Sequence, residues 1–380
     1  MLEWVRVATS SGKEGGRRRV IMVVLHGLAF LCGVGMVVGT FWSAMRTFVV
    51  PRDVNDWLSR SVFILMRRLF NLVVVRLGSY KARDRVLAAY APATLLCLPL
   101  VWMAIVTCGY TGIYWSLGAA DLQIAVKYSG SSLLTLGFIE PQGFPITIFV
   151  FSEAALELLL VALLIAYLPT IYSAFSHREV AVTMLEVRAG NPPSAVELLT
   201  RYARLKRFDK LTDLWETWET WFAEVEESHT SFSALAFFRS PKPEHSWVTA
   251  AGAVLDSASL LLSALDLPPD PQANLCIRAG YITLGRLAAY FSIPTPVNPA
   301  PTSPISVGRD EFDEALDHME RGGVPLKADR DAAWQAFSGW RVNYDVALLG
   351  LAALTLAPEA PWSGDRPAMP IGARIQRPWG

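Results

Sequence analysis

The sequence predicts an all-α membrane protein that has three transmembrane helices, a re-entrant loop and an all-α cytoplasmic domain. Hydrophobic residues make up 52% of the 380 residues and are concentrated in residues 1–175, as expected for a membrane half followed by a soluble half. A Ser/Thr-rich turn at 131–141 separates two long apolar segments, about 88–115 and 145–173. From about residue 177, apolar positions recur at helical spacing among charges, and few stretches alternate with period two.

The N-terminal part is predicted as a tail, residues 1–19, followed by a first transmembrane helix at 20–50. The apolar run that starts at Val20 exceeds the core of a signal peptide and reaches the roughly 20 residues that span a bilayer. We therefore expect a retained helix rather than a cleaved leader. The spacing of Gly35 and Gly39 permits a close helix contact, although glycine is also common in membrane helices for no such reason.

Residues 51–87 are predicted as a basic amphipathic helix in the membrane interface. Arginines and lysines outnumber the acidic residues, and apolar side chains recur at helical spacing. These apolar positions are Trp57, Val62, Leu65, Leu69, Leu72 and Val73. The alternative is a soluble helix packed on the cytoplasmic domain.

Residues 88–176 are predicted as a unit of two transmembrane helices, about 88–115 and 146–173, that enclose a re-entrant pore loop. Tyr110, Tyr114 and Trp115 gather near the end of the first helix, as in an aromatic belt at a membrane surface. The excess of positive charge in 51–87 places that segment in the cytoplasm. We therefore expect a multi-pass protein of the cell membrane, with its C-terminal domain cytoplasmic.

The C-terminal half is predicted as a helical domain at 177–356 and a poorly packed tail rich in Pro and Gly at 357–380. Ser194 follows two prolines and is a plausible helix N-cap. A stripe of tryptophans at spacing three predicts a buried helix face or a subunit interface, and consists of Trp215, Trp218 and Trp221. The expected helices are 179–206, 208–228, 246–265, 272–292 and 329–356, with a Pro-rich loop at 293–304.

The residues of the loop at 131–141 suit a narrow ion path. Backbone carbonyl groups can replace the water that a cation loses on entering such a path. A chain that turns its carbonyls toward one axis needs glycine where the backbone adopts positive φ, and Gly137 lies in the middle of this loop. A short helix that aims its negative end at the ion is also needed, and residues 122–133 are predicted to form it.

Residues 85–180 resemble the two-span, pore-loop potassium channel family. The filter of that family reads Thr-Val-Gly-Tyr-Gly-Asp, with Pro soon after, and this chain matches it in order with Thr135, Leu136, Gly137, Phe138, Ile139, Glu140 and Pro141. Ile139 falls on the second glycine and departs from the pattern, because a β-branched residue tolerates positive φ poorly. The resemblance implies a homotetramer that conducts monovalent cations, and the departure puts potassium selectivity in doubt.

Three further residues are assigned roles in this pore domain. Glu153 and Glu157 lie four residues apart in the predicted third transmembrane helix and therefore share one face. An ionisable residue in a membrane helix usually faces the protein interior or water, so we expect both to line a cavity and attract cations. The alternatives are that Glu153 is solvated near the outer surface, or that both are protonated and only pack. Pro169 is expected to bend the helix near its cytoplasmic end and serve a gate, or to have no gating role.

No other motif points to chemistry. No nucleotide-binding loop, zinc-ligand spacing or catalytic triad stands out, so an enzyme, a cofactor or a metal beyond the permeating cation is not expected. The net charge of zero gives no reason to expect a nucleic-acid partner. The sequence therefore predicts a potassium-channel-like cation channel. The alternative is a non-conducting membrane scaffold or sensor whose helical cytoplasmic domain binds partners.

Overall fold

The computed structural model describes residues 2–48 and 56–366, with side chains from Val20 onward, and most of the described residues are helical. One isolated β-bridge joins Leu265 to Leu326, and no strand is present in the described ranges. This confirms the prediction of an all-α protein. Residues 49–55, which end the predicted first transmembrane helix and begin the predicted interfacial helix, lie outside the described residues, as do residues 367–380 of the predicted tail.

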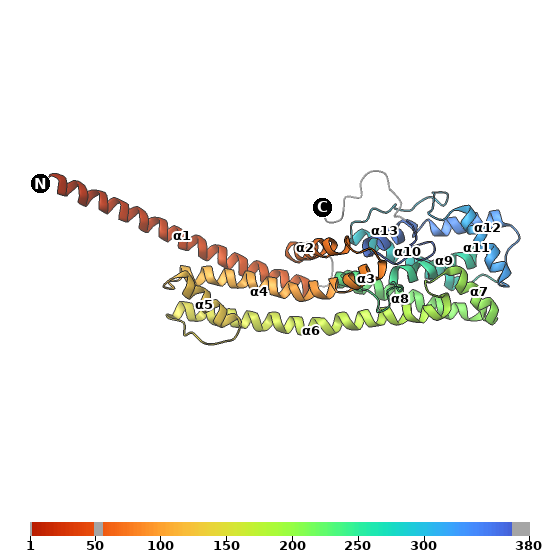
Figure 1. The fold of residues 1–380 in the computed structure, drawn as a ribbon, viewed down its shortest axis with the longest axis horizontal. Coiled ribbons are helices and arrows are strands. Elements are labelled where there is room, and N and C mark those ends of the chain that lie inside the picture. The colour runs from red at the N-terminus through yellow and green to blue at the C-terminus, as the bar shows by residue number, and fades with distance from the viewer. Residues whose placement is uncertain (1, 49–55, 367–380) are drawn as a thin grey trace. The chain divides into compact units, whose positions relative to one another are not determined.

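The chain divides into two compact units, each of which we describe by itself. The first unit comprises residues 1–65 and 94–169, and the second comprises 66–93 and 170–380. The helices of the first unit are α1 (Leu2–Phe48), α4 (Tyr90–Ser116), α5 (Leu122–Leu133) and the first half of α6 (Phe144–Ala189), as Figure 1 shows. The boundary within α6 falls directly after Pro169.

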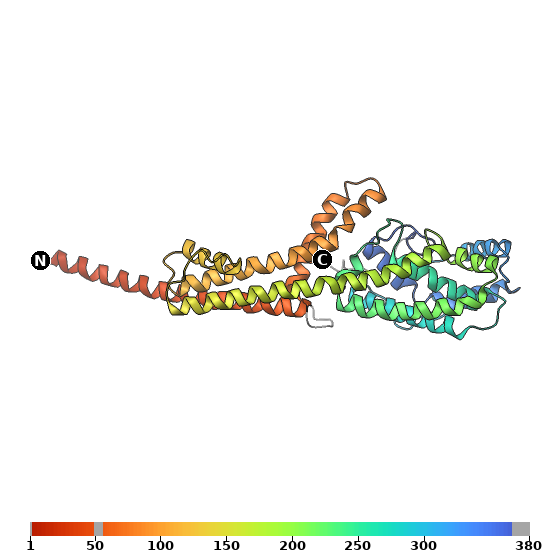
Figure 2. The same ribbon diagram turned by 90° about the horizontal axis from the view of Figure 1, so that it is seen from below.

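Two helices replace the single amphipathic helix predicted at 51–87. They are α2 (Trp57–Val74) and α3 (Tyr80–Ala88), joined by a turn that is visible in Figure 2. The predicted helix is interrupted because Ser79 starts a separate helix, α3. The hydroxyl of Ser79 accepts the backbone N–H of Ala82. Trp57, Leu65, Leu69 and Leu72 are exposed, so the apolar face predicted from the sequence is present on the surface of α2.

Helices α1 and α4 pack with their backbones in close approach. A Cβ atom on Gly33 would lie 2.5 Å from the carbonyl oxygen of Gly109, and a Cβ on Gly109 would lie 2.9 Å from that of Gly33. Only glycine fits at these two positions. By contrast, Gly35 and Gly39 have open space around them, so the contact expected at their spacing is made by Gly33 instead.

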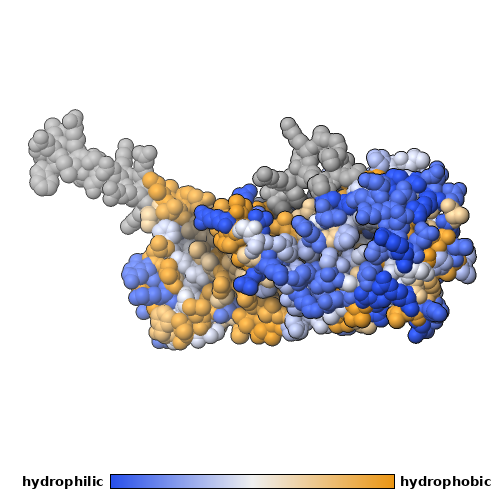
Figure 3. Space-filling model, turned by 45° about the vertical axis from the view of Figure 1, so that its right-hand side comes forward, coloured by the Kyte–Doolittle hydropathy of each residue, from blue (hydrophilic) through white to orange (hydrophobic). Residues whose placement is uncertain are grey.

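Among the described residues, four helical segments are long and apolar enough to cross a membrane: Val20–Phe48, Tyr80–Ser116, Phe144–Ala189 and Trp247–Ala264. The last of these, α9, was predicted as part of the cytoplasmic domain. Its apolar window is 94% buried inside the protein, against 11%, 33% and 17% for the other three. A helix whose apolar surface is already covered by protein has little left for lipid. Figure 3 shows the hydrophobic surface gathered over the first unit and hydrophilic surface over most of the second.

The second unit is built around α9 (Trp247–Ala264). Helices α7 (Ala195–Leu205), α10 (Pro271–Tyr290), α12 (Arg330–Arg341) and α13 (Asp345–Thr355) contact it, and α8 (Leu211–Ser231) packs on α10. The tryptophan stripe of α8 is buried in this core, which confirms that interpretation. Short 3-10 turns at Phe208–Lys210 (η1) and Ser233–Phe237 (η2) flank α8, and α11 (Arg309–Arg321) completes the helices.

Several element boundaries in the second unit differ from the prediction. The segment 179–206 is broken at residues 190–194, where Ser194 caps α7 by accepting the N–H of Glu197. The segment 329–356 forms two helices, α12 and α13. The Pro-rich residues 293–304 contain no helix, as predicted.

The part of the predicted tail that the structure describes, residues 357–366, is well packed, so that expectation is wrong. Trp362 is buried against Phe337, with ring centroids 5.5 Å apart, and its carbonyl oxygen accepts a hydrogen bond from Arg341. A large aromatic side chain that fills a core cavity outweighs the entropy of ordering a short Pro-rich segment.

A fully buried charge network fixes the core of the second unit. The guanidinium of Arg341 donates to Asp256 on α9 at 2.5 Å and to Asp345 on α13 at 2.8 Å. The phenol of Tyr344 also donates to Asp256, at 2.8 Å. Burial opposes the charge of Arg341, but the two carboxylates outweigh it and raise the pKa of this side chain.

Candidate functional site

The candidate site is the helix α5 with the loop that follows it. The helix runs from Leu122 to Leu133, the limits predicted from the sequence. It begins there because the carboxylate of Asp121 accepts the backbone N–H of Ile124 at 2.7 Å. Its inner side, with Ala125 and Tyr128, packs in one hydrophobic cluster with residues of α4 and α6. The short helix is therefore held between its two neighbours in sequence.

The loop after α5 folds back on the end of that helix. The N–H groups of Leu136 and Gly137 both donate to the carbonyl oxygen of Ser131, at 2.9 and 3.3 Å. The N–H of Thr135 donates to the carbonyl of Ser132 at 3.1 Å, and that of Phe138 to the hydroxyl of Ser131 at 3.1 Å. The loop thus satisfies carbonyl groups that every helix end leaves unpaired.

The carbonyl groups of the loop, unlike its N–H groups, have no hydrogen-bond partner among the described residues. Within the described residues, the carbonyl oxygens of residues 134–140 accept no hydrogen bond. Thr135 has φ 49° and Gly137 has φ 62°, both in the left-handed region. That region is rare for a β-branched residue such as Thr135, so the loop is held in a constrained conformation. The loop therefore leaves its carbonyl oxygens without a hydrogen-bond donor in the described part of the chain.

The predicted filter residues divide into exposed residues and one anchor. Leu136 and Phe138 are exposed, at 59% and 61%, and Thr135, Gly137 and Glu140 are exposed as well. Ile139, which departs from the family pattern, instead packs its side chain against the cluster formed by α4, α5 and α6. Its φ is not positive. The isoleucine therefore anchors the loop where the family pattern has a flexible glycine.

Glu153 is buried between helices of the chain and is not exposed on its surface. Its side chain is fully buried between three helices. One carboxylate oxygen accepts the hydroxyl of Tyr114 on α4 at 2.7 Å, and the other accepts the hydroxyl of Ser129 on α5 at 2.5 Å. Because both of its oxygens are used, Glu153 is a clamp that holds α5 against α4 and α6.

Glu157 lies one turn further along α6 and differs from Glu153 in its bonding. Its side chain is largely buried, and its Oε2 atom has no hydrogen-bond partner in the described part of the chain. A buried acidic oxygen without a partner is costly unless water, a cation or another chain completes it. Pro169 lies inside α6, on its exposed side, at the boundary between the two units.

The partners of Glu153 could not be predicted from the sequence. Tyr114 and Tyr110 were assigned to an aromatic belt, but both are buried, and the hydroxyl of Tyr110 lies 2.9 Å from that of Ser152. The belt interpretation is therefore wrong for these two residues. A helical pattern alone does not show which phenol reaches which carboxylate.

Comparisons with protein-family models, with curated proteins and with solved structures give no match to this chain. The class of protein therefore comes from the chain itself. Its helices are those of a membrane protein by length and composition.

Proposed function

We propose that the chain is one subunit of a homotetrameric cation channel of the cell membrane, rather than an enzyme. Residues 134–140 are the ion path, and four copies surround the axis because one loop cannot enclose an ion. The observation that carries the proposal is the set of unbonded carbonyl oxygens in this loop. Non-helical backbone at membrane depth is tolerated where it is buried in protein or lines water.

The membrane topology in this proposal has three spans: α1, α4 and the first half of α6. The near-complete burial of α9 favours a place in the soluble domain for this helix. The second unit and the α2–α3 segment are cytoplasmic, in keeping with the exposed arginines Arg68, Arg76, Arg83 and Arg85. The exposed apolar face of α2 contacts the lipid bilayer.

The acidic residues have separate roles in this proposal. Glu157, with its partnerless buried oxygen, meets the permeating cation or its water, while Glu153 positions the short helix. Pro169 is the point at which α6 bends for gating, because the two compact units meet within this helix directly after it. Potassium is among the conducted ions, and the anchored Ile139 predicts a filter less selective than one with two glycines.

The test is cation flux through purified protein in liposomes, with ion substitution. Wild-type protein is expected to pass monovalent cations, and the variant G137A to lose most of the flux, because alanine is strained at φ 62°. The matched control is G118A, which places alanine at another positive φ, 102°, in the turn before α5, and is also surrounded by open space.

The outcome also separates the rival function. A folded tetramer that passes no ion would support the non-conducting scaffold or sensor. Under the channel proposal, I139G shifts selectivity toward potassium, because a glycine can turn its carbonyl toward the axis. Equal loss of flux in G137A and G118A would contradict the assignment of the loop as the ion path.

A further inference from the structure

The segment Leu235–Ser240, which we call the 235–240 segment, begins within η2 and ends before α9 in the second unit. It is short and mostly non-helical after Phe237. Two helices that continue into candidate spans bind it from different sides. One is α6, which is continuous from Phe144 to Ala189, and the other is α3, which is separated from α4 by one residue.

The contact from α6 is made by Arg178. This side chain is fully buried and donates through Nη1 to the carbonyl of Leu235 and through Nη2 to that of Phe238, both at 2.8 Å. Its Nη1 also lies 3.0 Å from Nε2 of His229 on α8. Glu179 balances the charge, at 2.8 Å from Nη2. Because the guanidinium is buried and fully bonded, α6 cannot shift here without breaking charge-assisted hydrogen bonds.

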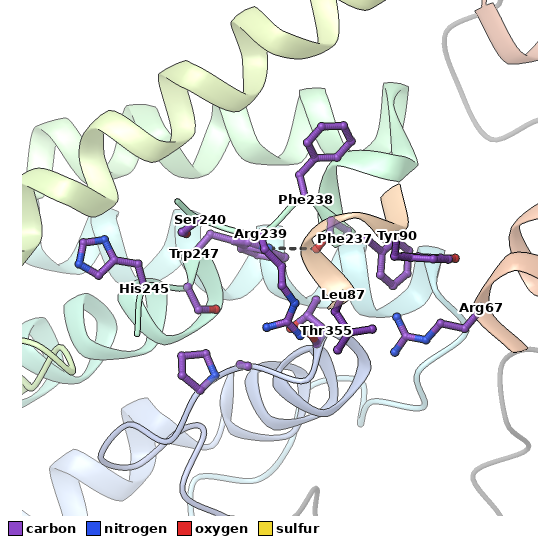
Figure 4. Close-up of a pocket in the computed structure, with 14 residues that line it drawn as sticks. Arg67, Leu87, Tyr90, Phe237, Phe238, Arg239, Ser240, His245, Trp247 and Thr355 are labelled. Carbon is purple, nitrogen blue, oxygen red and sulfur yellow. Dashed lines mark hydrogen bonds between the residues drawn. The ribbon is translucent and has the colours of Figure 1, made fainter. Parts of the chain in front are cut away.

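Arg239, the residue after Phe238, connects the 235–240 segment to α3. Its guanidinium donates to Asp84 of α3 at 2.5 Å and to the phenol of Tyr80 at 3.2 Å. The same group donates to the carbonyls of Thr355 and Leu356 at the end of α13, at 2.7 and 3.0 Å. Figure 4 shows the guanidinium of Arg239 beside Thr355.

A second arginine adds contacts to the end of α13 and to the 235–240 segment. Arg67 of α2 donates to the carbonyl of Leu354 at 3.0 Å and stacks over the rings of Tyr90 and Phe237. Figure 4 shows that Arg67 and Arg239 line one pocket of the second unit. The segment between α8 and α9 is therefore tied to α2, α3 and the end of α13 as well as to α6.

We infer that the 235–240 segment is the joint that couples α3 and α6 to the helical domain, with Arg178 and Arg239 as its positioning residues. The carbonyl of Phe238 is held by α6, and the next side chain holds α3. A displacement of either helix is passed to the other through one peptide unit. This inference rests on the proposed function only for its effect on gating, since the coupling itself can be measured without ion flow.

The first test is hydrogen exchange of the full chain in detergent or nanodiscs, for wild type and the variant D84A. This change removes the charged partner of Arg239 and leaves its bonds to α13 in place. Amides of α3 and of residues 235–240 are expected to exchange about tenfold faster. The control is E244A, which removes the ion pair of Glu244 with Lys81 at 3.4 Å, an exposed contact between the same two parts of the chain. No change is expected there.

The second test approaches the joint from α6. R178K keeps the charge and loses the fork that reaches two carbonyls at once. It is expected to speed exchange about tenfold in residues 235–240 and also in α3, which Arg178 does not touch. Unchanged exchange in α3 while the surroundings of Arg178 respond would overturn the joint. If R178K fails to fold, D84A decides alone, and exchange raised only within α3 would overturn it.

Flux measurements then connect the joint to gating. D84A and R178K are expected to change cation flux in the same direction, about fivefold or more, with the order of ion selectivity unchanged. Opposite or absent effects would overturn the gating role. If wild-type protein passes no cation, the proposed function fails, and the exchange data still decide whether the joint exists.

Discussion

Two helix ends in this molecule treat their carbonyl groups in opposite ways. At the end of α13, the carbonyls of Leu354, Thr355 and Leu356 accept hydrogen bonds from Arg67 and Arg239. After α5, the helix-end carbonyls are capped by loop N–H groups, but the carbonyls of residues 134–140 accept none within the described ranges. The second unit satisfies its polar backbone with charged side chains, and the loop of the first unit does not.

This difference leaves the carbonyl groups of the loop without a hydrogen-bond partner from the described part of the chain. Backbone carbonyl groups shielded from water carry a free-energy cost when unpaired, so proteins rarely leave them open. At the end of α13, two arginines provide the hydrogen bonds that such carbonyls need. The residues of the loop after α5 are largely exposed, so its open carbonyls can bind water, or a cation in the proposed channel.

The buried acids of the two units differ in the same way. In the second unit, Asp256 faces the full positive charge of Arg341. In the first, Glu153 has only the hydroxyls of Tyr114 and Ser129. Neutral partners suit a membrane interior, where a buried full charge pair would first have to be desolvated. Substitutions in the two units should therefore have separate effects, on stability in the second unit and on function in the first.

The largest effect is expected from R341M. Removing the guanidinium leaves Asp256 and Asp345 buried without their counter-charge, which costs about 3–5 kcal/mol of unfolding free energy. Thermal or chemical unfolding of the purified protein measures it. The control is R330A, which removes two exposed ion pairs with Asp317 and Glu320 and should leave the unfolding midpoint almost unchanged. If R341M lowered the unfolding free energy by much less than this, the charge network would not be what stabilises the core.

The next effect separates the two acidic residues of α6. E153L removes the acceptor of the buried hydroxyl of Tyr114 and leaves that of Ser129 with the longer contact to the carbonyl of Thr107, at 3.4 Å, and should destabilise the first unit by about 1–3 kcal/mol. E157L removes an oxygen that has no partner, so it should cost little stability and reduce cation flux. Hydrogen exchange of α5 and liposome flux give the two readouts. Equal behaviour of the two variants would contradict the distinction between clamp and ion-facing acid.

Much of the fold could be predicted because local signals agree with it. The limits of α5 follow from an N-cap at Asp121 and from the Ser/Thr-rich turn, and both are written in adjacent residues. The core role of the tryptophan stripe follows from helical spacing. By contrast, α11 was missed because most of its residues are charged, and only Phe312, Leu316 and Met319 mark its buried side clearly.

The bonding of the candidate site could not be predicted, because it depends on long-range contacts. Asp84 and Arg239 are 155 residues apart, and Glu153 meets a tyrosine 39 residues before it. Periodicity shows that a residue faces inward but not which partner it meets. For the same reason, Glu153 and Glu157 looked equivalent in sequence, and only packing separates them.

A smaller effect concerns acid stability of the second unit. Burial and the nearby charge of Arg178 hold the pKa of His229 well below its usual value. In the unfolded chain this histidine takes up a proton near pH 6.5, while in the folded chain it stays neutral. Its contribution is therefore complete above pH 6.5 and is lost as the pH falls below it, at up to about 1.4 kcal/mol per pH unit.

The measurement is the difference in unfolding free energy between wild type and H229Q from pH 7.5 to pH 5, a range set by the histidine pKa of about 6.5. Glutamine can accept from Arg178 and donate to Ser228, whose hydroxyl lies 3.1 Å from Nδ1 of the histidine, but it does not titrate. The variant should therefore lose less stability than wild type on acidification. Parallel pH profiles would show that the pKa of His229 is the same in the folded and unfolded chain, which would contradict the prediction.

The smallest effect addresses the capped helix end directly. R67Q removes one of two guanidinium groups from the end of α13, so the amides of Leu356 and Ala357 should exchange about fivefold faster, and global stability should change little. R68Q is the matched control, because Arg68 is the exposed neighbour and has no ion pair in the described part of the chain. If both variants exchange like wild type, Arg239 caps the helix end by itself. The contrast with the loop after α5 would then rest on one arginine, and α2 would be free to move without disturbing the domain.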